Sequence, residues 1–552
     1  MKANHHAVVL GPLAKVFPRA EPGLGCARFT ALRNETISFQ VAYAADDADC
    51  GLARVNVVSP IAGAVRVRKV SLVPCELPAY PWADENYLST APGLYPDLLE
   101  ELHGGQVRFL PRHWQSVWVD VRVTEDFPAG TFPVRVTFTH AQDGGELCAA
   151  EASVVVLDAA LPALHIPRTE WFHGDCLADY YNVPVFSEAH WAIMGRFVAL
   201  AVQRDINMIL TPHFTPPLDT AKGGERTTIQ LVGVRVSGGK YDFDFSLLKR
   251  WVDMCRRAGV KFFEMSHLFT QWGAEAAPKI MATVDGEHKR VFGWDTPAVG
   301  GEYTRFLRAY LPRLAAALRE WGVAGNTVFH VSDEPSLAQY DSYRAAKDSV
   351  AAELEGFAII DALSNHEFYE RGAVEVPVVA IDHIGEFLRR GAKPLWSYYC
   401  CGQSRGVSNR FMAMPSARAR VYGAQLFKFG IAGALHWGYN FYNSQHSLRH
   451  LNPYRVTDGG GAFPSGDAFL AYPGADGMPE ESLRMMTMAH AMADLRAMRR
   501  LETLAGREHV VNLIEEPLAT PLTFDEYPKD DAYFMALRER VNLEIEKRGV
   551  DF

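Results

Sequence analysis

Charge of one sign is not concentrated anywhere in this sequence, and long apolar runs are missing as well. The 552 residues carry a net charge of −10 without a long basic stretch, which excludes a nucleic-acid partner because phosphates require clustered Lys and Arg. No apolar run approaches the ~20 residues of a membrane span, and the N-terminal MKANHHAVVLGPLAKVF lacks the apolar core of a signal peptide. We expect neither nucleic acid nor membrane as a partner, and a cytoplasmic location.

Cysteine is scarce and scattered. The sequence has no CxxC pair, and two cysteines are direct neighbours, which suits neither a disulfide framework nor a zinc site. We expect free thiols in a reducing compartment at all positions, namely Cys26, Cys50, Cys75, Cys148, Cys176, Cys255, Cys400 and Cys401.

Motifs for cofactors and for serine nucleophiles are also absent. There is no GxSxG elbow and no glycine-rich phosphate loop. No HxH or HxxxH pair occurs among the histidines His173, His213, His267, His330 and His383, so hydrogen-bonded pocket histidines are favoured over a metal site. We expect no metal and no organic cofactor.

The composition is that of an ordinary globular protein. Apolar residues make up 48% and charged residues 22%, and the length suggests two or three domains. Aromatic residues make up 11%, which permits a sugar site because the C–H face of a sugar stacks on a flat ring.

The first ~160 residues alternate with period two and therefore predict β-strands. Apolar side chains alternate at 37–43, 117–123 and 134–138, and a short buried strand follows at 154–157. The turn EDFPAG between the second and third runs predicts that these two strands form a hairpin. Several such strands without a helical period indicate a β-sandwich.

From residue 169 onward, short apolar strands alternate with helical segments, which is typical of βα units. Eight strands are expected, at 169–173, 206–212, 260–266, 327–332, 357–363, 376–382, 394–399 and 433–438. The fold class predicted is therefore α/β with an all-β N-terminal domain: a β-sandwich at 1–160, a (β/α)8 TIM-type barrel at 168–505 and a helical extension at 506–552. Two long βα loops, 213–245 and 267–300, are expected to be functional.

Chemistry in such a barrel lies at the C-terminal strand ends, and the fourth strand ends in HVSDEP. Pro335 breaks the strand there, so Asp333 and Glu334 can reach one ligand. Because two close carboxylates oppose each other's second charge, one can stay protonated and serve as an acid. The alternative is that residues 332–335 only start the next helix, where acidic side chains are also favoured.

Aromatic residues stand at three other strand ends. Tryptophans belong to the core more often than to sugar platforms in general, but Trp171 and Trp437 lie beside polar residues at strand ends, which strengthens the case for a platform. Tyr398 and Tyr399 must point in opposite directions in a strand, so only one of them can face the barrel mouth.

The segments HVSDEP, SYYCCGQ and LHWGYNFY resemble glycoside hydrolase family 123. TEWFHGDCLADYYNVP, TPPLDT, QLVGV, FGWDT, SNRF and GGAFPSGDAFLAYPG are similar to the same family, and the resemblance spans roughly residues 10–510. It implies a β-sandwich followed by a barrel, and an exo-acting β-N-acetylgalactosaminidase or hexosaminidase. Its retaining mechanism would be substrate-assisted, with the 2-acetamido oxygen forming an oxazolinium intermediate.

The resemblance also implies roles for individual residues. Glu334 matches the general acid/base, and Asp333 matches the residue that holds the acetamido N–H and stabilises the intermediate. Tyr398 or Tyr399 would donate to the acetamido carbonyl, and Trp437 would form a wall of the −1 subsite. Further substrate contacts are expected by position from Trp171, His173, His213, His267, Asn365, Tyr439 and Asn440.

Two other functions stay open at this point. One is a retaining glycosidase for sugars without an acetamido group, with Asp382 or Asp175 as nucleophile. The other is a non-catalytic carbohydrate-binding protein. In every case the expected partner is a carbohydrate. For a cytoplasmic enzyme, this carbohydrate would be a short oligosaccharide. The oligomeric state is left open, with a homo-oligomer as one option.

Overall fold

The computed structural model describes residues 4–46 and 51–549, and its contacts divide the chain into two compact units. Unit 1 comprises Met1–His165, Ser408–Gly430 and Glu480–Phe552, and unit 2 comprises Ile166–Val407 and Ile431–Pro479. The units differ from the predicted domains, because residues 408–430 and 480–505 of the predicted barrel segment group with the N-terminal region. Unit 1 is therefore built from three separate segments of the chain and not from one continuous N-terminal segment.

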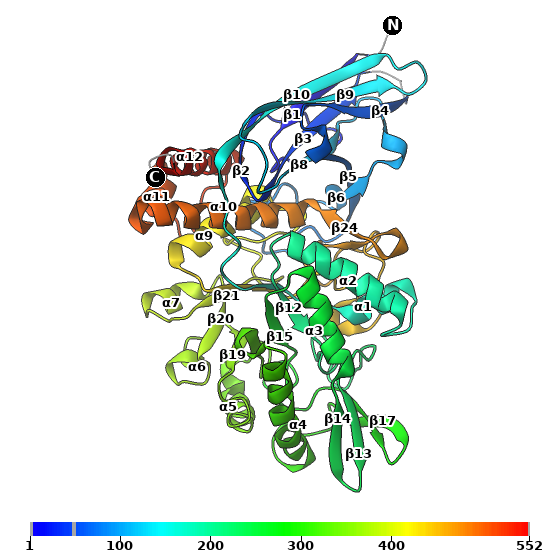
Figure 1. Ribbon diagram of the computed structural model, residues 1–552, viewed down its shortest axis with the longest axis vertical. Helices are drawn as coiled ribbons and strands as arrows, with labels where there is room; N and C mark the ends of the chain where they lie inside the picture. The colour runs from blue at the N-terminus through cyan, green and yellow to red at the C-terminus, as the bar shows by residue number, and fades with distance from the viewer. Residues whose placement is uncertain (1–3, 47–50, 550–552) are drawn as a thin grey trace. The chain divides into compact units, whose positions relative to one another are not determined.

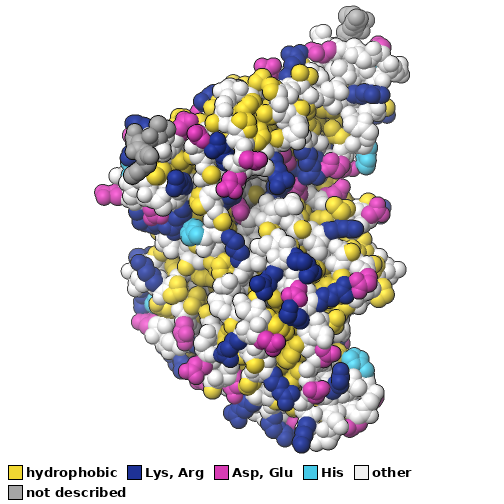
Figure 2. All heavy atoms as spheres, in the orientation of Figure 1, with side chains coloured by type: hydrophobic (Ala, Val, Ile, Leu, Met, Phe, Trp, Pro, Cys, Tyr) yellow, Lys and Arg dark blue, Asp and Glu magenta, His cyan; other side chains and the backbone are white. Residues whose placement is uncertain are grey.

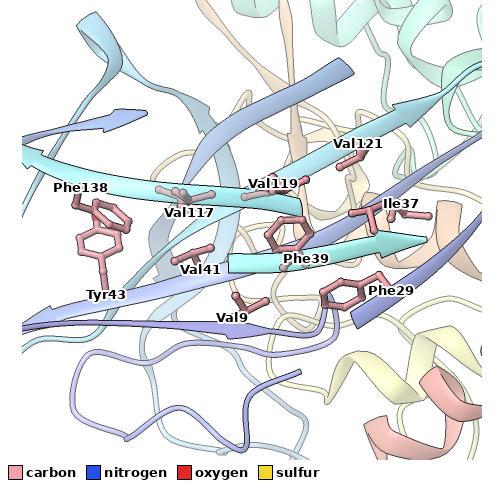
Figure 3. Close-up of a cluster of buried hydrophobic side chains, with 14 of the residues drawn as sticks. Val9, Phe29, Ile37, Phe39, Val41, Tyr43, Val117, Val119, Val121 and Phe138 are labelled. Atoms are coloured by element: carbon pink, nitrogen blue, oxygen red, sulfur yellow. The ribbon is translucent and has the colours of Figure 1, made fainter. Parts of the chain in front are cut away.

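The N-terminal region of unit 1 is all-β and contains strands of two sheets. The first sheet has the order β1 (His5–Leu10), β3 (Glu35–Ala45), β8 (Gln115–Val123), β5 (Val65–Cys75), β6 (Gly93–Glu101), and β24 (Pro479–Ser482) pairs with β6. The second has the order β2 (Arg28–Arg33), β10 (Glu146–Ala160), β9 (Gly130–His140), β4 (Leu52–Val58), β7 (Gln106–Arg108). Alternating side chains of both sheets share one apolar core, in which the rings of Tyr43 and Phe138 lie 4.8 Å apart (Figure 3).

The predicted hairpin between 117–123 and 134–138 is wrong. β8 pairs with β3 and β5, whereas β9 pairs with β10 and β4. Both strands turn their alternate apolar residues, Val119 and Val136 among them, into the same core. The segment between them therefore carries the chain from one sheet to the other instead of closing a hairpin.

Five α-helices complete the described part of unit 1. They are α8 (Ser416–Arg420), α9 (Tyr422–Phe429), α10 (Leu483–Ala505), α11 (Arg507–Glu515) and α12 (Asp531–Gly549). Buried ion pairs join α10, α12 and the first sheet, because Arg538 on α12 contacts both Asp494 on α10 and Glu35 on β3. None of the helices described by the structure is both long and apolar enough to span a bilayer.

Unit 2 contains a closed barrel of eight parallel strands, as predicted. In barrel order these are β11 (Arg168–Glu170), β12 (Met208–Thr211), β15 (Phe262–Met265), β18 (Thr327–Phe329), β19 (Ala358–Leu363), β20 (Val376–Ala380), β21 (Trp396–Tyr398) and β22 (Gly433–His436). From β11 to β21, helices of this unit separate successive strands (Figure 1): α1 (Gly174–Tyr181), α2 (Glu188–Gln203), α3 (Ser246–Ala258), α4 (Gly301–Glu320), α5 (Tyr340–Asp348), α6 (Glu367–Glu370) and α7 (Ile384–Arg389).

The helix α3 shows why these segments fold as they do. Its buried residues Leu248, Trp251, Val252 and Cys255 recur at helical spacing, so one stripe faces the barrel. The helix ends at Gly259, whose φ of 101° is a left-handed conformation that a side chain would disfavour.

The two long loops contain structure that the sequence analysis missed. Strands β13 (Gly233–Ser237), β14 (Lys240–Asp244), β16 (Ile280–Val284) and β17 (Glu287–Phe292) form a four-stranded sheet built from two hairpins (Figure 1). This sheet ties the loop after β12 to the loop after β15, because β13 pairs with β16.

Side chains of both charges are mixed on the molecular face seen in Figure 2. Of the eight cysteines, Cys50 lies outside the described residues, and the other seven form no disulfide with one another.

Candidate active site

A cavity of about 200 Å³ lies at the C-terminal ends of the barrel strands. Six of the residues predicted for the site line it, namely Trp171, His173, Asp333, Glu334, Tyr398 and Trp437. They come from four strand segments: two follow β11, two follow β18, one ends β21 and one follows β22. The barrel therefore brings together residues up to 266 positions apart in the sequence, from Trp171 to Trp437.

The backbone turns sharply at the Asp333–Glu334 pair. β18 ends at Phe329, and Glu334 has a φ of 45°, a left-handed conformation that is uncommon for a residue with a side chain. The next helical turn begins later: Ser336 is its N-cap, and Ser336 and Gln339 form a capping box. The two carboxylates therefore do not cap this helix, and the turn lets both of them line the cavity.

Both carboxyl groups of the pair have raised pKa values. Loss of hydration against the cavity walls raises the pKa of Asp333 well above its usual range, and the Glu334 carboxyl raises it further while His330 opposes the shift. Loss of hydration also raises the pKa of Glu334, although the hydrogen bond from Tyr398 lowers it. The pair can thus retain a proton at a pH where an ordinary carboxyl has lost it.

The structure distinguishes the two neighbouring tyrosines. Tyr398 lines the cavity and donates a hydrogen bond from Oη to Glu334 Oε1 at 2.5 Å. Tyr399 is buried and packs edge-on against His436, with ring centroids 4.9 Å apart. Of the two candidates, Tyr398 is the one that faces the barrel mouth.

A buried charge network lies behind Asp333. The His330 ring contacts Glu264 Oε1 through Nε2 at 2.6 Å and Asp361 Oδ1 through Nδ1 at 3.1 Å. Burial alone would lower the pKa of His330, but the hydrogen bonds to Asp361 and Glu264 outweigh it and raise the pKa to about 10. An imidazolium between two carboxylates fixes the strand that carries the catalytic candidates.

The two tryptophans offer only their rings to a ligand. Trp171 donates its indole N–H to Glu264 Oε1 at 2.8 Å, and Trp437 donates its own to Asp467 Oδ2 at 2.9 Å. Trp437 is further packed edge-on against Phe463, which also lines the cavity. With their polar atoms held by the protein, both rings present apolar walls of the kind that the C–H face of a sugar requires.

His173 lines the cavity, yet the protein already uses both of its ring nitrogens. Nε2 contacts the Trp437 carbonyl oxygen at 2.9 Å and Nδ1 contacts the Arg226 guanidinium at 3.1 Å. Burial and the charge of Arg226 lower the pKa of His173 to about 3, so the ring is neutral. His173 therefore helps to fix the cavity wall, and neither of its ring nitrogens is left to bond to a ligand.

Five other predicted residues do not line the cavity: His213, His267, Asn365, Tyr439 and Asn440. Their side chains serve the fold instead. His213 contacts the Ser266 carbonyl, Tyr439 donates to the Phe197 carbonyl, Asn440 bonds both backbone groups of His173, and Asn365 accepts from the Glu367 N–H. His267 is buried and stacks on His330 with ring centroids 4.3 Å apart.

Several lining residues were missed by the sequence analysis, among them Asp219, Gln271, Trp272, Cys400, Cys401 and His446. Asp219 lies in TPPLDT, a segment that carried the family resemblance without any residue being singled out. Trp272 lies seven positions after the end of β15 at Met265, in the loop that follows this strand. The two long loops supplied Asp219, Gln271 and Trp272, and loops have no periodicity from which side-chain direction can be read.

The described residues contain one group with the spacing of metal ligands: His267, His330 and Asp361. His330 already engages carboxylates through both nitrogens, and a protonated imidazole has no lone pair for a metal. The arrangement fits an internal ion-pair network better than a metal centre.

The two carboxylates considered as alternative nucleophiles are engaged elsewhere. Asp175 forms a two-pronged ion pair with Arg226, and both side chains are buried. Asp382 accepts from Gln403 and contacts His383, and it does not line the cavity. Neither is placed beside the Asp333–Glu334 pair as a free carboxylate facing the same space.

The comparisons with known proteins agree with this geometry. The family model of the glycoside hydrolase 123 catalytic domain matches residues 171–501. A family 123 glycoside hydrolase from Clostridium perfringens, whose structure was analysed for glycolipid glycan hydrolysis, superimposes with a TM-score of 0.75 at 13% identity, over 100% of this chain and 99% of that one. At that identity the likeness shows the fold alone.

Two further matches are weak. A Ruminococcus gnavus β-glucuronidase in complex with uronic isofagomine gives a TM-score of 0.31 at 8% identity, over 87% of this chain and 72% of that one. The N-terminal domain of PorA gives 0.16 at 10% identity, over 28% of this chain and 100% of that one. Neither score indicates a common overall fold, and no curated protein matches significantly. Because the family model covers more than half of the sequence, the chain belongs to glycoside hydrolase family 123.

Proposed function

We propose that this chain is an exo-acting, retaining β-N-acetylhexosaminidase that prefers N-acetylgalactosamine and uses the substrate's 2-acetamido group as nucleophile. The observation that carries the proposal is the Asp333–Glu334 pair in a cavity with aromatic walls, with Tyr398 bonded to Glu334. Family membership supports glycoside hydrolysis as the reaction class.

In the proposed reaction, Glu334 and Asp333 have separate tasks. Protonated Glu334 donates its proton to the glycosidic oxygen as the bond to the anomeric carbon breaks. The acetamido carbonyl oxygen attacks that carbon, and Asp333 accepts the acetamido N–H and stabilises the positive oxazolinium. Glu334 then removes a proton from water, which opens the oxazolinium and gives the β-configured sugar.

Tyr398 would couple substrate binding to the proton on Glu334. A tyrosine has a single O–H, and Tyr398 donates it to Glu334 Oε1. When an acetamido carbonyl takes that hydrogen bond instead, Glu334 loses a contact that lowers its pKa. Binding of the acetamido group therefore favours the protonated acid that the first step requires.

The size of the cavity supports action on chain ends. About 200 Å³ is smaller than the ~300–1,000 Å³ of pockets that enclose drug-sized ligands. Such a volume suits one sugar ring, with the remainder of the substrate outside. A cavity of this size supports removal of single terminal residues.

The test is hydrolysis of p-nitrophenyl glycosides of β-GalNAc, β-GlcNAc, β-Gal and their α counterparts. Wild type is compared with Glu334→Gln and Asp333→Asn, and Asp382→Asn is the matched control because it removes a nearby carboxylate that does not line the cavity. We expect release only from β-N-acetyl sugars, a loss of about 10²–10⁴-fold in Glu334→Gln and about 10²–10³-fold in Asp333→Asn.

Asp382→Asn should stay within a few-fold of wild type. Efficient release from β-Gal would contradict the acetamido mechanism, and loss of activity in Asp382→Asn would point to an enzyme nucleophile. Absence of release from every glycoside would contradict the proposed function itself.

A further inference from the structure

A third carboxylate, Asp219, lines the same cavity as Asp333 and Glu334, and the reaction proposed above gives it no role. It stands in the loop after β12, whereas the pair follows β18 and Tyr398 ends β21. In the closed barrel β12 and β21 are separated by β11 and β22 on one side and by β15 to β20 on the other. Asp219 and Tyr398 therefore approach a ligand from different walls.

The backbone around Asp219 is held from several sides. Its N–H donates to Gln271 Oε1 at 2.7 Å, and its carbonyl accepts from Ser447 Oγ at 2.8 Å. The preceding carbonyl, of Leu218, accepts from Arg226, which is itself paired with Asp175. Asp219 has a φ of 40°, so these contacts hold it in a left-handed conformation that is uncommon for residues other than glycine.

The carboxylate itself keeps room for further donors. Among the described residues, only the His446 N–H donates to it within hydrogen-bond distance, to Oδ2 at 3.1 Å. His446 Nδ1 is 3.8 Å from Oδ1, too far for a hydrogen bond. A carboxylate has about four acceptor positions, so most of those of Asp219 are unused. Its side chain is 17% exposed and the exposed part faces the cavity.

Two other polar residues that line the cavity, His173 and Gln271, have less capacity left. Both nitrogens of His173 are engaged, and Gln271 accepts from Asp219 and donates to the Thr220 carbonyl. Trp171 and Trp437 present rings. An acceptor with unused capacity in an aromatic-walled cavity is suited to sugar hydroxyls, which are donors.

We propose that Asp219 is a specificity-determining residue that accepts hydrogen bonds from the hydroxyls at C4 and C6 of the terminal sugar. The assignment to these hydroxyls rests on the proposed function: with C1 at Glu334 and the C2 acetamido group at Asp333 and Tyr398, the ring atoms opposite are C4 and C5. These carry O4 and the C6 hydroxymethyl group. Asp219 thereby reads the position at which N-acetylgalactosamine and N-acetylglucosamine differ.

The experiment is a cycle of one protein change and one substrate change. Wild type and Asp219→Asn are assayed on the better p-nitrophenyl β-N-acetylhexosaminide and on its 4-deoxy and 6-deoxy analogues. The asparagine keeps one oxygen to accept from the His446 N–H but replaces the other with an amide that cannot accept. Ser447→Ala is the matched control, because it removes a bond to the Asp219 backbone and leaves the carboxylate in place.

We expect deletion of the 4- or 6-hydroxyl to lower kcat/KM of the wild type and of Ser447→Ala by about 10–100-fold. In Asp219→Asn the same deletion should cost less than about 3-fold, because the partner is already gone. If the substitution lowers kcat/KM of parent and deoxy substrates by the same factor, Asp219 supports the loop or acts as a nucleophile, and the proposal is overturned.

This outcome is distinguishable from failure of the proposed function. A wild type that prefers sugars without an acetamido group would refute the acetamido mechanism, and the cycle would then be run on that sugar. If no glycoside is hydrolysed, the cycle is run on the dissociation constants of methyl glycosides with Glu334→Gln, measured by calorimetry. If the losses of binding free energy from Asp219→Asn and from deletion of the hydroxyl are additive, the proposal is overturned there as well. If the two losses are not additive, the proposal is supported.

Discussion

Tyr398 Oη donates a hydrogen bond to Glu334 Oε1 at 2.5 Å, joining the end of β21 to the turn after β18. This contact lowers the pKa of Glu334 against the loss of hydration that raises it. The same O–H is the donor that the proposed mechanism needs for the acetamido carbonyl. In the proposed mechanism, this one hydroxyl bonds to the acid before the substrate binds and to the acetamido carbonyl afterwards.

Replacing Tyr398 with Phe should move the pH profile in a defined direction. Without the hydrogen bond, the pKa of Glu334 in the free enzyme rises. Since Glu334 is active when protonated, activity persists to higher pH, and the alkaline limb of kcat/KM moves upward. We also expect kcat/KM at its optimum to fall about 10–100-fold from loss of the acetamido contact. An alkaline limb that stays in place or moves to lower pH would contradict the assignment of Glu334 as the acid.

His330→Ala should destabilise the protein by about 3–5 kcal/mol, because it leaves the buried carboxylates Glu264 and Asp361 without their shared cation. The measurement is urea unfolding at neutral pH. His366→Ala is the control, since His366 is also a buried histidine but its nearest carboxylate oxygen is 3.9 Å away. Equal losses in the two variants would show that removing a buried ring, and not the charge, accounts for the effect.

The stability that His330 contributes should depend on pH. Its pKa is raised to about 10 in the folded protein, from about 6.5 in the unfolded chain. A raised pKa means that the contribution is complete below about pH 6.5 and is lost as the pH rises through about 10. The free energy of unfolding of wild type minus that of His330→Gln should therefore shrink between pH 7 and pH 9.5. A difference that is constant or grows over this range would refute a charged His330.

Gly433→Ala should destabilise the barrel by about 1–3 kcal/mol through overpacking. A Cβ at Gly433 on β22 would lie 2.1 Å from the ring of Trp396 on β21, inside the core cluster of unit 2. Gly325→Ala is the control, since no heavy atom lies within 4 Å of its Cβ and its φ is not positive. Thermal unfolding of both variants checks the prediction, and a Gly433→Ala protein as stable as its control would contradict the close packing.

Much of the fold could be predicted because its elements are periodic. Helix α2 begins directly after its N-cap residue Ser187, and helix α3 ends directly before its C-cap residue Gly259. Both bounds agree with the apolar stripe of the helix. The predicted hairpin was wrong because alternation of apolar and polar residues fits a strand in either sheet. Such alternation does not specify which strands pair with each other. The helices after residue 480 group with unit 1 through long-range contacts that no local pattern encodes.

The site could be predicted in part for the same reason. Strand ends located Asp333, Glu334, Trp171, Trp437 and Tyr398, all of which line the cavity. A position at a strand end does not determine whether a polar side chain contacts a ligand or the protein. Tyr439 and Asn440 lie at such positions, and in the structure they bond to backbone groups. Asp219 and Trp272 lie on loops whose positive φ angles, 40° and 59°, depend on tertiary contacts.

The central claim, that the substrate's acetamido oxygen is the nucleophile, is tested most directly with a series of p-nitrophenyl glycosides that carry acetyl, fluoroacetyl, difluoroacetyl and trifluoroacetyl groups on N2. Fluorine withdraws electrons from the carbonyl oxygen and weakens it as a nucleophile while the leaving group stays the same. If the acetamido oxygen is the nucleophile, kcat of the wild type falls steadily with each added fluorine. A kcat that is insensitive to fluorination would contradict this claim and require a nucleophile from the protein.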